Sequence, residues 1–429
     1  MIALAALLVT VLILLSIPVA ATLAIVGLTL SELYAFFPLT DALGDVAWSA
    51  STQFLLVAIP LFIMMGELLL RSGVTDEMYR ALDQWLRRVP GGLMHTNIAA
   101  CAMFSATSGS SVATTATVGT ISVPNIARYG YNPRLFLGSV AAGGTLGILI
   151  PPSINMILYG VLADASVTAL YLAALIPGLV LASLFALVVL LACLARPDWS
   201  GERRETPPLG VRLKGLVGLL TPIGLFLLVV GSIYAGLATP TEAASLGVLG
   251  ALAATAWRGA LSIRVLLEVF HGTMRTTCMV MLIVLAAYFL NFVISNIGLT
   301  DALVSLVHGL GWEPIHVLLA IIVVYFLMGC FMETISMMIA TTPIVVPIVV
   351  ALGYDPIWFG VLFMILIEAA LITPPIGVNL FVVQSVRRGG SFRDVVVGAF
   401  PFLLMMMVMI GLLIVFPSLA LMLPELVRG

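Results

Sequence analysis

The sequence predicts an all-α polytopic membrane protein built as an inverted repeat, with two re-entrant helical hairpins and two proline-broken helices. Three observations point to this fold class. Hydrophobic residues make up 62% of the 429 residues and charged residues only 9%, with a mean hydropathy of +1.21. Apolar runs of the roughly 20 residues needed to cross a bilayer recur along the chain. A set of proline motifs also repeats at one constant spacing.

This composition excludes a water-soluble protein, because so much apolar surface could not be buried inside one soluble core. Lipid is therefore the expected solvent, and the lipid bilayer is the first expected partner. The formal net charge is -2, and the basic residues are scattered singly or in pairs among the loops. No basic tract could grip phosphates, so we expect no nucleic-acid binding.

Nine apolar segments are long enough to be full spans. They are residues 4–30, 53–70, 134–163, 168–195, 215–235, 240–257, 272–294, 356–384 and 396–418. Two further segments, 92–127 and 315–350, are interrupted near the middle by small or polar residues, and we interpret them as re-entrant hairpins. With this interpretation the basic loops all fall on one side, as the positive-inside rule requires.

An internal repeat connects the two halves of the chain. GYNP at 130–133 is answered by GYDP at 353–356, and Pro151-Pro152 by Pro374-Pro375, at one offset of 223 residues. Self-similarity at a fixed offset indicates homologous units. We predict a first unit at 1–195, a cytoplasmic loop and linking span at 196–239, and a second unit at 240–429. The four spans of the first unit and the one linking span make an odd number of crossings before the second unit begins. The second unit is therefore expected to be inverted, with the binding sites near the midplane between the two units.

The hairpin tips and the broken helices mark the expected binding sites. Non-helical backbone at membrane depth is tolerated only where protein or a water-filled cavity covers it. The sequence is interrupted at 108–111 and 332–336 in the hairpins and at 146–155 and 371–380 in the broken helices. Proline, glycine and serine also serve kinks and close packing in membrane helices. Their repetition at one offset favours the interpretation as sites.

A double proline leaves the carbonyls before it without intrahelical partners, because proline has no N–H and disfavours helix in the preceding residue. Such carbonyls suit a sodium ion, and we expect two sodium sites. The first would use the carbonyls of Gly147, Leu149 and Ile150 with a hydroxyl from Ser108 or Ser111. The second would use the carbonyls of Met332, Ile372 and Thr373, the Thr373 hydroxyl and the backbone of Gly377.

Beyond each break, the restarted helix exposes free N–H groups and the positive end of its dipole, which favours an anion such as a carboxylate. The side chains best placed to join that contact are Ser110, Thr145, Ser153, Asn155, Thr334 and Asn379. Glu333 is an intramembrane acid at a hairpin tip, which favours a role in the same site. For Glu368, a site role and a structural hydrogen bond near the break both remain open.

Enzyme chemistry has little support in the sequence, and we expect a protein that is not an enzyme. There is no HExxH, no GxSxG and no glycine-rich phosphate loop with a lysine. The expected energy source is an ion gradient, since one charge moving through the membrane potential releases about 2.3 kcal/mol per 100 mV.

Several stretches resemble the large membrane subunit, DctM-like, of the tripartite ATP-independent periplasmic (TRAP) transporters. They are SGSSVATTATVGTISVPNIARYGYNPRLF, AAGGTLGILIPPSIN, FMETISMMIATTPIVVPIVVALGYDPIWFG, EAALITPPIGVNLFVV and AIPLFIMMGELLLRSG. The resemblance implies an elevator-type, sodium-driven permease in the bacterial inner membrane. It also implies a periplasmic binding protein that delivers a small organic acid, such as a sialic acid or a C4-dicarboxylate, and a small four-helix membrane subunit as a separate chain.

Two alternatives stay open at this point. The first is a self-sufficient sodium/dicarboxylate or citrate symporter with the same hairpins, and the second is a membrane scaffold or enzyme on the same fold. We further expect the hairpins and broken spans to move as one block. The amphipathic segments 74–89 and 299–310, which begin with the similar GVTD and GLTD, would hold this block against a fixed scaffold.

Overall fold

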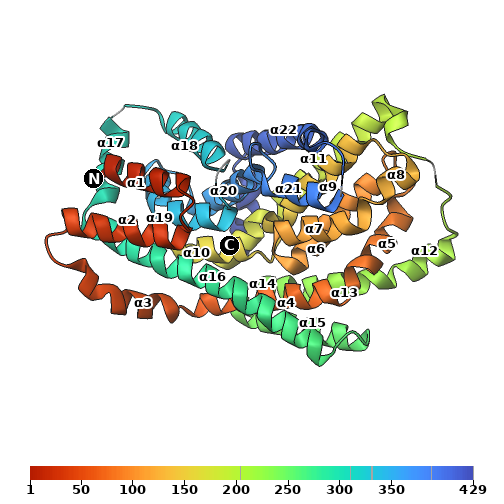
Figure 1. Cartoon of the computed structure of the whole chain (residues 1–429), viewed down its shortest axis with the longest axis horizontal. Coiled ribbons are helices and arrows are strands. Elements are labelled where there is room, and N and C mark those ends of the chain that lie inside the picture. Colours follow the sequence, from red (N-terminus) through yellow and green to blue (C-terminus); the bar gives the residue numbers. More distant parts are fainter. Residues whose placement is uncertain (203, 310, 330–331, 388, 429) are drawn as a thin grey trace.

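The computed structural model describes residues 1–202, 204–309, 311–329, 332–387 and 389–428. Over these residues the chain forms helices joined by turns and loops, and its one β-type contact is an isolated bridge between Tyr131 and Ser200. The molecule is elongated, and the long helix α16 (Ile263–Asn296) runs beside α2 (Val19–Tyr34) and α4 (Ala58–Arg71) (Figure 1). The prediction of an all-α membrane protein is confirmed.

Six helical segments of the described chain are long and apolar enough to cross a membrane, and a seventh span is a bent pair. The six are Phe54–Arg71, Val167–Ala195, Leu209–Tyr234, Ile263–Asn296, Thr334–Ala351 and Phe392–Val415. The bent pair is α9 (Pro133–Leu149) and α10 (Ile154–Leu162), which meet at 44°. The sequence correctly places a break in this span, at Pro151-Pro152.

The expected first span, 4–30, is wrong as one continuous helix. It consists of α1 (Ile2–Leu14) and α2, which are separated by a turn in which Ser16 has a φ of 58°. Pro18 immediately precedes α2 and has no N–H to continue the hydrogen-bond ladder of α1. Mean hydropathy does not detect such a break, because both helices are apolar.

Each segment expected to be a hairpin consists of two helices that contact each other. The first pairs α6 (Leu93–Ser108) with α7 (Ser111–Ser122), and the second pairs α18 (Pro314–Gly329) with α19 (Thr334–Ala351). Between α6 and α7 the chain reverses at Gly109, whose φ of +60° is a left-handed conformation that glycine adopts without strain. The short break leaves the start of α7 open for a side-chain cap.

The helix starts recur at the spacing of the sequence motifs. The residues that cap α7 and α19 are Ser110 and Glu333, which are 223 positions apart. The caps of α9 and α20 (Pro356–Ala370), Asn132 and Asp355, are separated by the same offset. In all four, a side-chain oxygen accepts from backbone N–H groups of the first turn. The division into two inverted units stays a prediction that these matching starts support.

The remaining helices surround this arrangement. The described chain also contains α3 (Leu43–Ser51), α5 (Val74–Leu86), α8 (Asn125–Tyr129), α11 (Val167–Ala195), α12 (Leu209–Gly215), α13 (Val217–Phe226), α14 (Ser232–Tyr234), α15 (Pro240–Trp257), α17 (Leu299–Gly309), α21 (Val378–Arg387), α22 (Phe392–Val415) and α23 (Ser418–Arg428). Short 3-10 or π segments lie at Leu39–Ala42, Phe54–Val57, Pro197–Trp199 and Leu227–Gly231. Helices α5 and α17 lie where the two amphipathic arms were expected. Helix α4 packs between α15 and α16.

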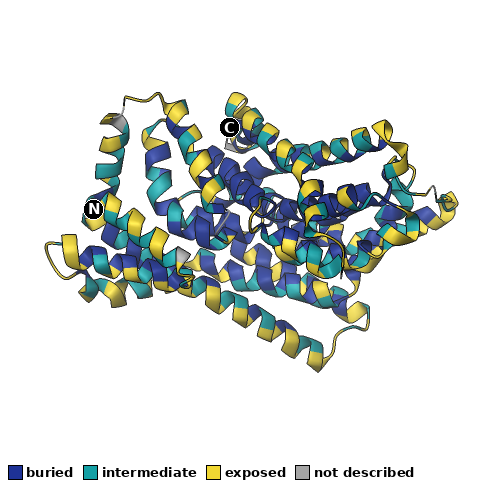
Figure 2. Cartoon of the chain, turned by 45° about the horizontal axis from the view of Figure 1, so that its top comes forward, coloured by how far each residue is buried: buried dark blue, intermediate teal, exposed yellow. Residues whose placement is uncertain are grey.

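The most buried helices are α9 and α20, which belong to the two broken spans. Every residue from 135 to 149 and from 357 to 370 is buried, and the buried residues gather in the middle of the molecule (Figure 2). Apart from a few polar residues, which include Thr145 and Glu368, both helices are apolar all round, and a helix that is apolar all round is buried. Close backbone approach helps to enclose α9, because Gly138 lies directly against the backbone of Gly398 on α22. The broken spans therefore form the centre of the fold.

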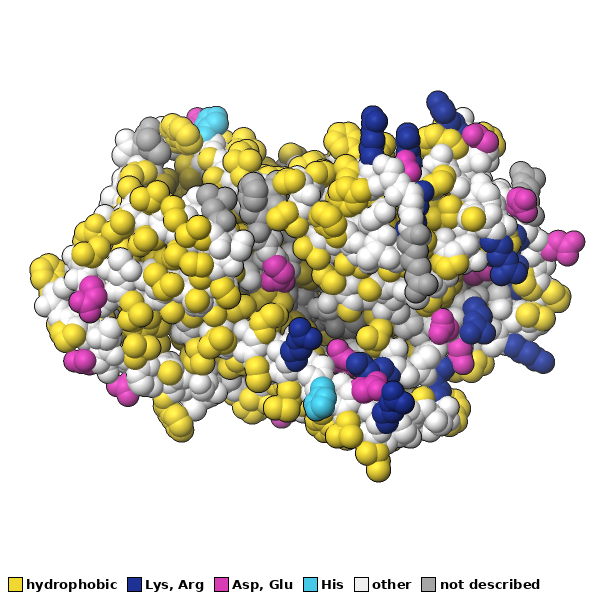
Figure 3. All heavy atoms as spheres, in the orientation of Figure 1, with side chains coloured by type: hydrophobic (Ala, Val, Ile, Leu, Met, Phe, Trp, Pro, Cys, Tyr) yellow, Lys and Arg dark blue, Asp and Glu magenta, His cyan; other side chains and the backbone are white. Residues whose placement is uncertain are grey.

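Charged side chains are distributed unevenly along the molecule. On the face drawn in Figure 3, Lys and Arg gather toward the end that contains α5, α8 and α12, together with some Asp and Glu, while the opposite end, near α3 and α17, shows acidic side chains and no Lys or Arg. This is the one-sided distribution that the loop charges of the sequence predict.

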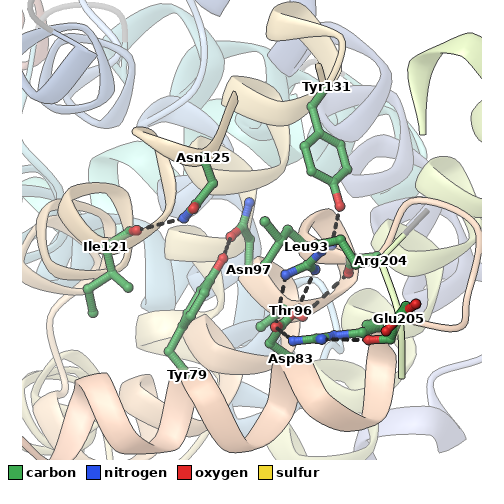
Figure 4. Close-up of polar contacts among 12 residues, drawn as sticks. Tyr79, Asp83, Leu93, Thr96, Asn97, Ile121, Asn125, Tyr131, Arg204 and Glu205 are labelled. Atoms are coloured by element: carbon green, nitrogen blue, oxygen red, sulfur yellow. Dashed lines mark hydrogen bonds and ion pairs between the residues drawn. The ribbon is translucent and has the colours of Figure 1, made fainter. Parts of the chain in front are cut away.

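A polar cluster at the basic end ties the loop after α11 to α5. The Asp83 carboxylate accepts hydrogen bonds from Arg204 at 2.5 and 3.0 Å and from Arg87 at 2.5 Å (Figure 4). The guanidinium of Arg204 also lies over the Tyr129 ring, 4.8 Å from its centroid. Burial alone would lower the pKa of Arg204, but its hydrogen bond and ion pair with Asp83 outweigh burial and raise that pKa.

Candidate functional site

A cavity of about 320 Å³ lies where the two hairpin tips approach the two broken helices. Ser110 and Glu333 line it from the two tips, Asn155 from the start of α10, and Leu371 from the end of α20. Helix α4 closes another side through residues that include Glu67. Residues from widely separated parts of the sequence therefore share one chamber, at the breaks that the sequence predicted.

The residues predicted to bind substrate divide into a lining group and a buried group. Ser110, Asn155, Glu333 and Thr334 line the cavity. The buried group consists of Thr145, Ser153 and Asn379. The Thr145 hydroxyl donates to the carbonyl of Ala142 at 2.7 Å, and the Asn379 amide donates to the carbonyl of Ala141 at 3.2 Å. Thr145 and Asn379 thus hold the first broken helix rather than face the cavity.

Two polar side chains at the start of α10 lack hydrogen-bond partners among the described residues. They are the Ser153 hydroxyl and the Asn155 amide nitrogen, and both residues are buried. A buried polar group without a hydrogen bond costs free energy, so a bound ligand or water is expected to pair with these two groups. The backbone N–H groups in the first turn of α10 also have no acceptor within the helix. Together these donors suit a carboxylate oxygen.

Glu333 is held by its own helix. Its carboxylate accepts from the backbone N–H groups of Ile335 and Ser336, both at 3.1 Å, and from the hydroxyls of Thr334 and Ser336 at 3.1 and 3.2 Å. This is an N-cap in which a negative charge meets the positive end of the α19 dipole. The cap fixes the orientation of the acid at the rim of the cavity.

The residues predicted for the first sodium site lie together. A Cβ added at Gly147 would be 2.9 Å from the Ser111 hydroxyl oxygen, so the end of α9 and the start of α7 are in close contact. No hydrogen bond between described residues reaches the carbonyls of Gly147, Leu149 or Ile150. Free carbonyls beside a hydroxyl are the hard oxygen ligands that an alkali cation needs. The side chain of Ser108 lies outside the described part of the chain.

The residues predicted for the second sodium site come from three places: Ile372 and Thr373 follow α20, Gly377 directly precedes α21, and Met332 lies before α19 at the second hairpin tip. The Thr373 hydroxyl donates to the carbonyl of Ala369 at 2.7 Å, and no hydrogen bond between described residues reaches the carbonyls of Met332, Ile372 or Thr373. The Gly377 carbonyl differs, because it accepts from the N–H groups of Leu380 and Phe381 at 2.7 and 3.4 Å. Among the described residues, the three predicted carbonyls of Met332, Ile372 and Thr373 therefore accept no hydrogen bond and can bind a cation.

Sequence reasoning missed the wall that α4 and α16 contribute. Ile63, Gly66 and Glu67 of α4 and Thr276 of α16 line the cavity. Glu67 is an acid within an apolar helix, a pattern that by itself indicates function. It forms an ion pair with Arg71 one turn later. Thr276 has no comparable signal, since a lone threonine in a membrane helix most often bonds to its own backbone.

Comparison with known protein families decides the class of transporter. The model of the DctM component of the tripartite ATP-independent periplasmic transporters matches residues 6–419. The chain belongs to this family. The suspected relation to the large TRAP subunit is thus confirmed, and the relatives of this TRAP permease chain are named as membrane permeases rather than as enzymes.

Three relatives illustrate the range of the family. The C4-dicarboxylate TRAP transporter large permease protein of Pseudomonas aeruginosa is 32% identical over 389 residues, covering 88% of each chain. The sialic acid TRAP transporter large permease protein of Vibrio cholerae is 30% identical and covers 92% of this chain and 93% of the relative. The ectoine TRAP transporter large permease protein of Halomonas elongata is 30% identical, covering 86% of each chain.

A solved structure extends the similarity to the fold. The YdaH transporter of Alcanivorax borkumensis aligns with this TRAP permease chain at a TM-score of 0.66, over 94% of this chain and 98% of the other. The sequence identity is 18%, so the likeness concerns the arrangement of the helices alone.

Proposed function

We propose that this TRAP large permease catalyses sodium-coupled secondary active uptake of a small organic acid across the bacterial inner membrane. The observation that carries the proposal is the cavity in which both hairpin tips and both broken helices meet. Breaks of this kind are where transporters place substrate and coupling ions. The family membership supplies the class of protein, and the geometry of the cavity supports the chemistry.

Two groups of residues would share the work at this cavity. Free carbonyls at the ends of α9 and α20, with the hydroxyls of Ser111 and Thr373, would hold two sodium ions. A bound cation supplies positive charge beside the cavity without a basic side chain. Ser153, Asn155 and the N-terminus of α10 would bind the substrate carboxylate through N–H and O–H donors. Binding of sodium would therefore strengthen binding of the substrate anion, and binding of the substrate anion would strengthen binding of sodium.

The substrate class and partners of the proposal follow from the relatives. Their names include a C4-dicarboxylate and a sialic acid, both of which carry carboxylates. We propose that a periplasmic binding protein delivers such an acid, and that a small four-helix membrane subunit binds the permease as a separate chain. Transport would follow an elevator mechanism, in which the hairpins and broken helices move past α4 and α16.

The first prediction concerns these partners. Proteoliposomes with the permease and the small subunit should take up substrate only when the binding protein is present and a sodium gradient points inward. Collapsing the sodium gradient at constant membrane potential should abolish uptake. A potassium gradient of the same size is the control. Sodium-driven uptake by the permease alone would instead favour a self-sufficient symporter, and absence of any sodium-dependent flux with all partners present would favour a scaffold or enzyme.

A second prediction tests the ion assignment. Ser108→Ala, Ser111→Ala and Thr373→Ala each remove one oxygen and little volume, so they should raise the sodium concentration for half-maximal uptake more than they lower stability. Loss of a group that supports a metal ligand weakens metal binding by roughly ten- to a hundredfold, and loss of the ligand itself should weaken it at least as much. Sodium-dependent uptake and thermal unfolding of each variant measure the two effects. Normal transport by all three variants at limiting sodium would refute the assignment.

A further inference from the structure

Glu368 is a buried acid of α20 that no ion pair of the described residues reaches. It is 1% exposed, and its helix is surrounded by α9, α10, α11, α18, α19, α22 and α23. The basic residues on these neighbours are near helix ends. Arg134, for example, is the second residue of α9, about 20 Å along that helix from Ile148, whose backbone N–H lies beside the Glu368 carboxyl. An ionised carboxylate in such surroundings needs a positive charge from another source.

The Glu368 carboxyl crosses from the second half of the chain to the tip of the first hairpin. The Ser111 hydroxyl donates to its Oε1 at 2.6 Å, although the two residues are 257 positions apart. The second oxygen, Oε2, is buried and has no partner among the described residues. Ser111 itself is 3% exposed and lies against Gly147 at the end of α9. Glu368 thus lies beside the free carbonyls of the first broken helix.

The direction of this hydrogen bond matters for cation binding. A hydroxyl has one proton to donate and two lone pairs to offer. It can ligate a cation only through a lone pair, so its proton must point elsewhere. Because Glu368 accepts that proton, the lone pairs of the Ser111 hydroxyl are free to point toward Gly147 at the end of α9. The same carboxylate supplies negative charge next to the position that the cation would occupy.

We propose that Glu368 is the positioning residue of the first sodium site: it orients the Ser111 hydroxyl toward the ion and compensates the charge of the ion. The second half of the chain thereby completes the site of the first half. This inference rests on the proposed sodium coupling. It also resolves the two roles that the sequence left open for Glu368, because the hydrogen bond is part of the site.

The test is sodium-dependent thermal stabilisation of the purified full-length chain. Sodium chloride is titrated against choline chloride at constant ionic strength, and the unfolding midpoint is followed, since a ligand that binds only the folded state raises that midpoint as it saturates its site. Glu368→Gln keeps the shape and an acceptor for Ser111 but removes the charge. It should shift the half-saturating sodium concentration upward by roughly ten- to a hundredfold, the usual effect of losing the support of a ligand. Its midpoint without sodium should not fall.

Tyr159→Phe is the matched control. The Tyr159 hydroxyl donates to the Pro356 carbonyl at 2.6 Å, so this variant also removes one hydrogen bond between the two halves, at a distance from the proposed ions. Its sodium titration should match that of the wild type. Glu368→Asp keeps the charge but is one methylene shorter, so it should weaken sodium binding as well.

The outcomes separate the two proposals. If the wild type is stabilised by sodium and Glu368→Gln titrates at the same concentration, the role of Glu368 is refuted while sodium coupling stands. If Glu368→Gln does not fold, Glu368→Asp decides, and a wild-type titration of that variant overturns the proposal. If sodium does not stabilise the wild type more than choline does, the sodium coupling and the inference built on it fall together.

Discussion

Bridging the first hairpin tip to α4 should stop uptake completely and reversibly. Ser110 on the tip and Ile63 on α4 line the same cavity from two sides. If the hairpins and broken helices move as one block past α4 and α16, a covalent bridge between these sides prevents the movement. Ser110→Cys with Ile63→Cys, treated with a short bifunctional thiol reagent that can be reduced, should lose all uptake. Reduction should restore the rate of the untreated double variant.

The native cysteines and a fixed pair supply the controls. Cys278 is exposed whereas Cys101 and Cys193 are buried, so the experiment starts from a variant without native cysteines. A pair within the proposed scaffold uses the contact between α4 and α15, where a Cβ at Gly247 would be 2.6 Å from the Met65 sulfur. Cross-linking Met65→Cys to Gly247→Cys should leave uptake intact. A bridge between Ser110 and Ile63 that forms equally with and without sodium, and leaves uptake unchanged, would exclude the moving block.

Local signals account for the parts of this fold that could be predicted from the sequence. Proline pairs and short polar interruptions act on the backbone where they occur, so the break between α9 and α10 and the turn at Gly109 follow from the residues themselves. The amphipathic pattern of α5 is local in the same way. The break before Pro18 carries a proline too, yet its flanking helices are so apolar that average hydropathy treats them as one span.

Long-range contacts could not be predicted, because nothing in the local sequence specifies the partner. Ser111 and Glu368 are 257 positions apart, and Asp83 and Arg204 are 121 apart. The free hydroxyl of Ser153 and amide of Asn155 were predicted as site residues from their place after the double proline, and they do lie at the start of α10. Glu67 was not predicted because it lies on the continuous helix α4, where no break in the backbone marks a site.

The largest effect on stability is expected at Asp83. This carboxylate accepts from Arg87 and Arg204, and the three side chains are only 11 to 18% exposed. Asp83→Asn keeps the size of the side chain but leaves two largely buried guanidinium groups without their common counter-charge. Removing one partner of a buried ion pair costs at least about 3 kcal/mol. The midpoint of thermal unfolding of the purified chain should therefore fall by several degrees, and proteolysis should cut the loop after α11 sooner.

An exposed ion pair provides the comparison that tests this reasoning. The pair of Arg264 and Glu268 lies within one helix, with Arg264 89% exposed, so Arg264→Gln should change stability by less than about 1 kcal/mol. Adding Arg204→Gln to Asp83→Asn should cost less than the sum of the two single changes, because the second variant removes a charge that the first left unpaired. Additive effects, or equal losses for Asp83→Asn and Arg264→Gln, would show that the Asp83 cluster does not fasten the loop to α5. The attachment would then depend on the hydrogen bonds that Arg87 donates to the Glu205 carbonyl at 2.8 Å and Arg88 donates to the Thr206 hydroxyl at 3.3 Å.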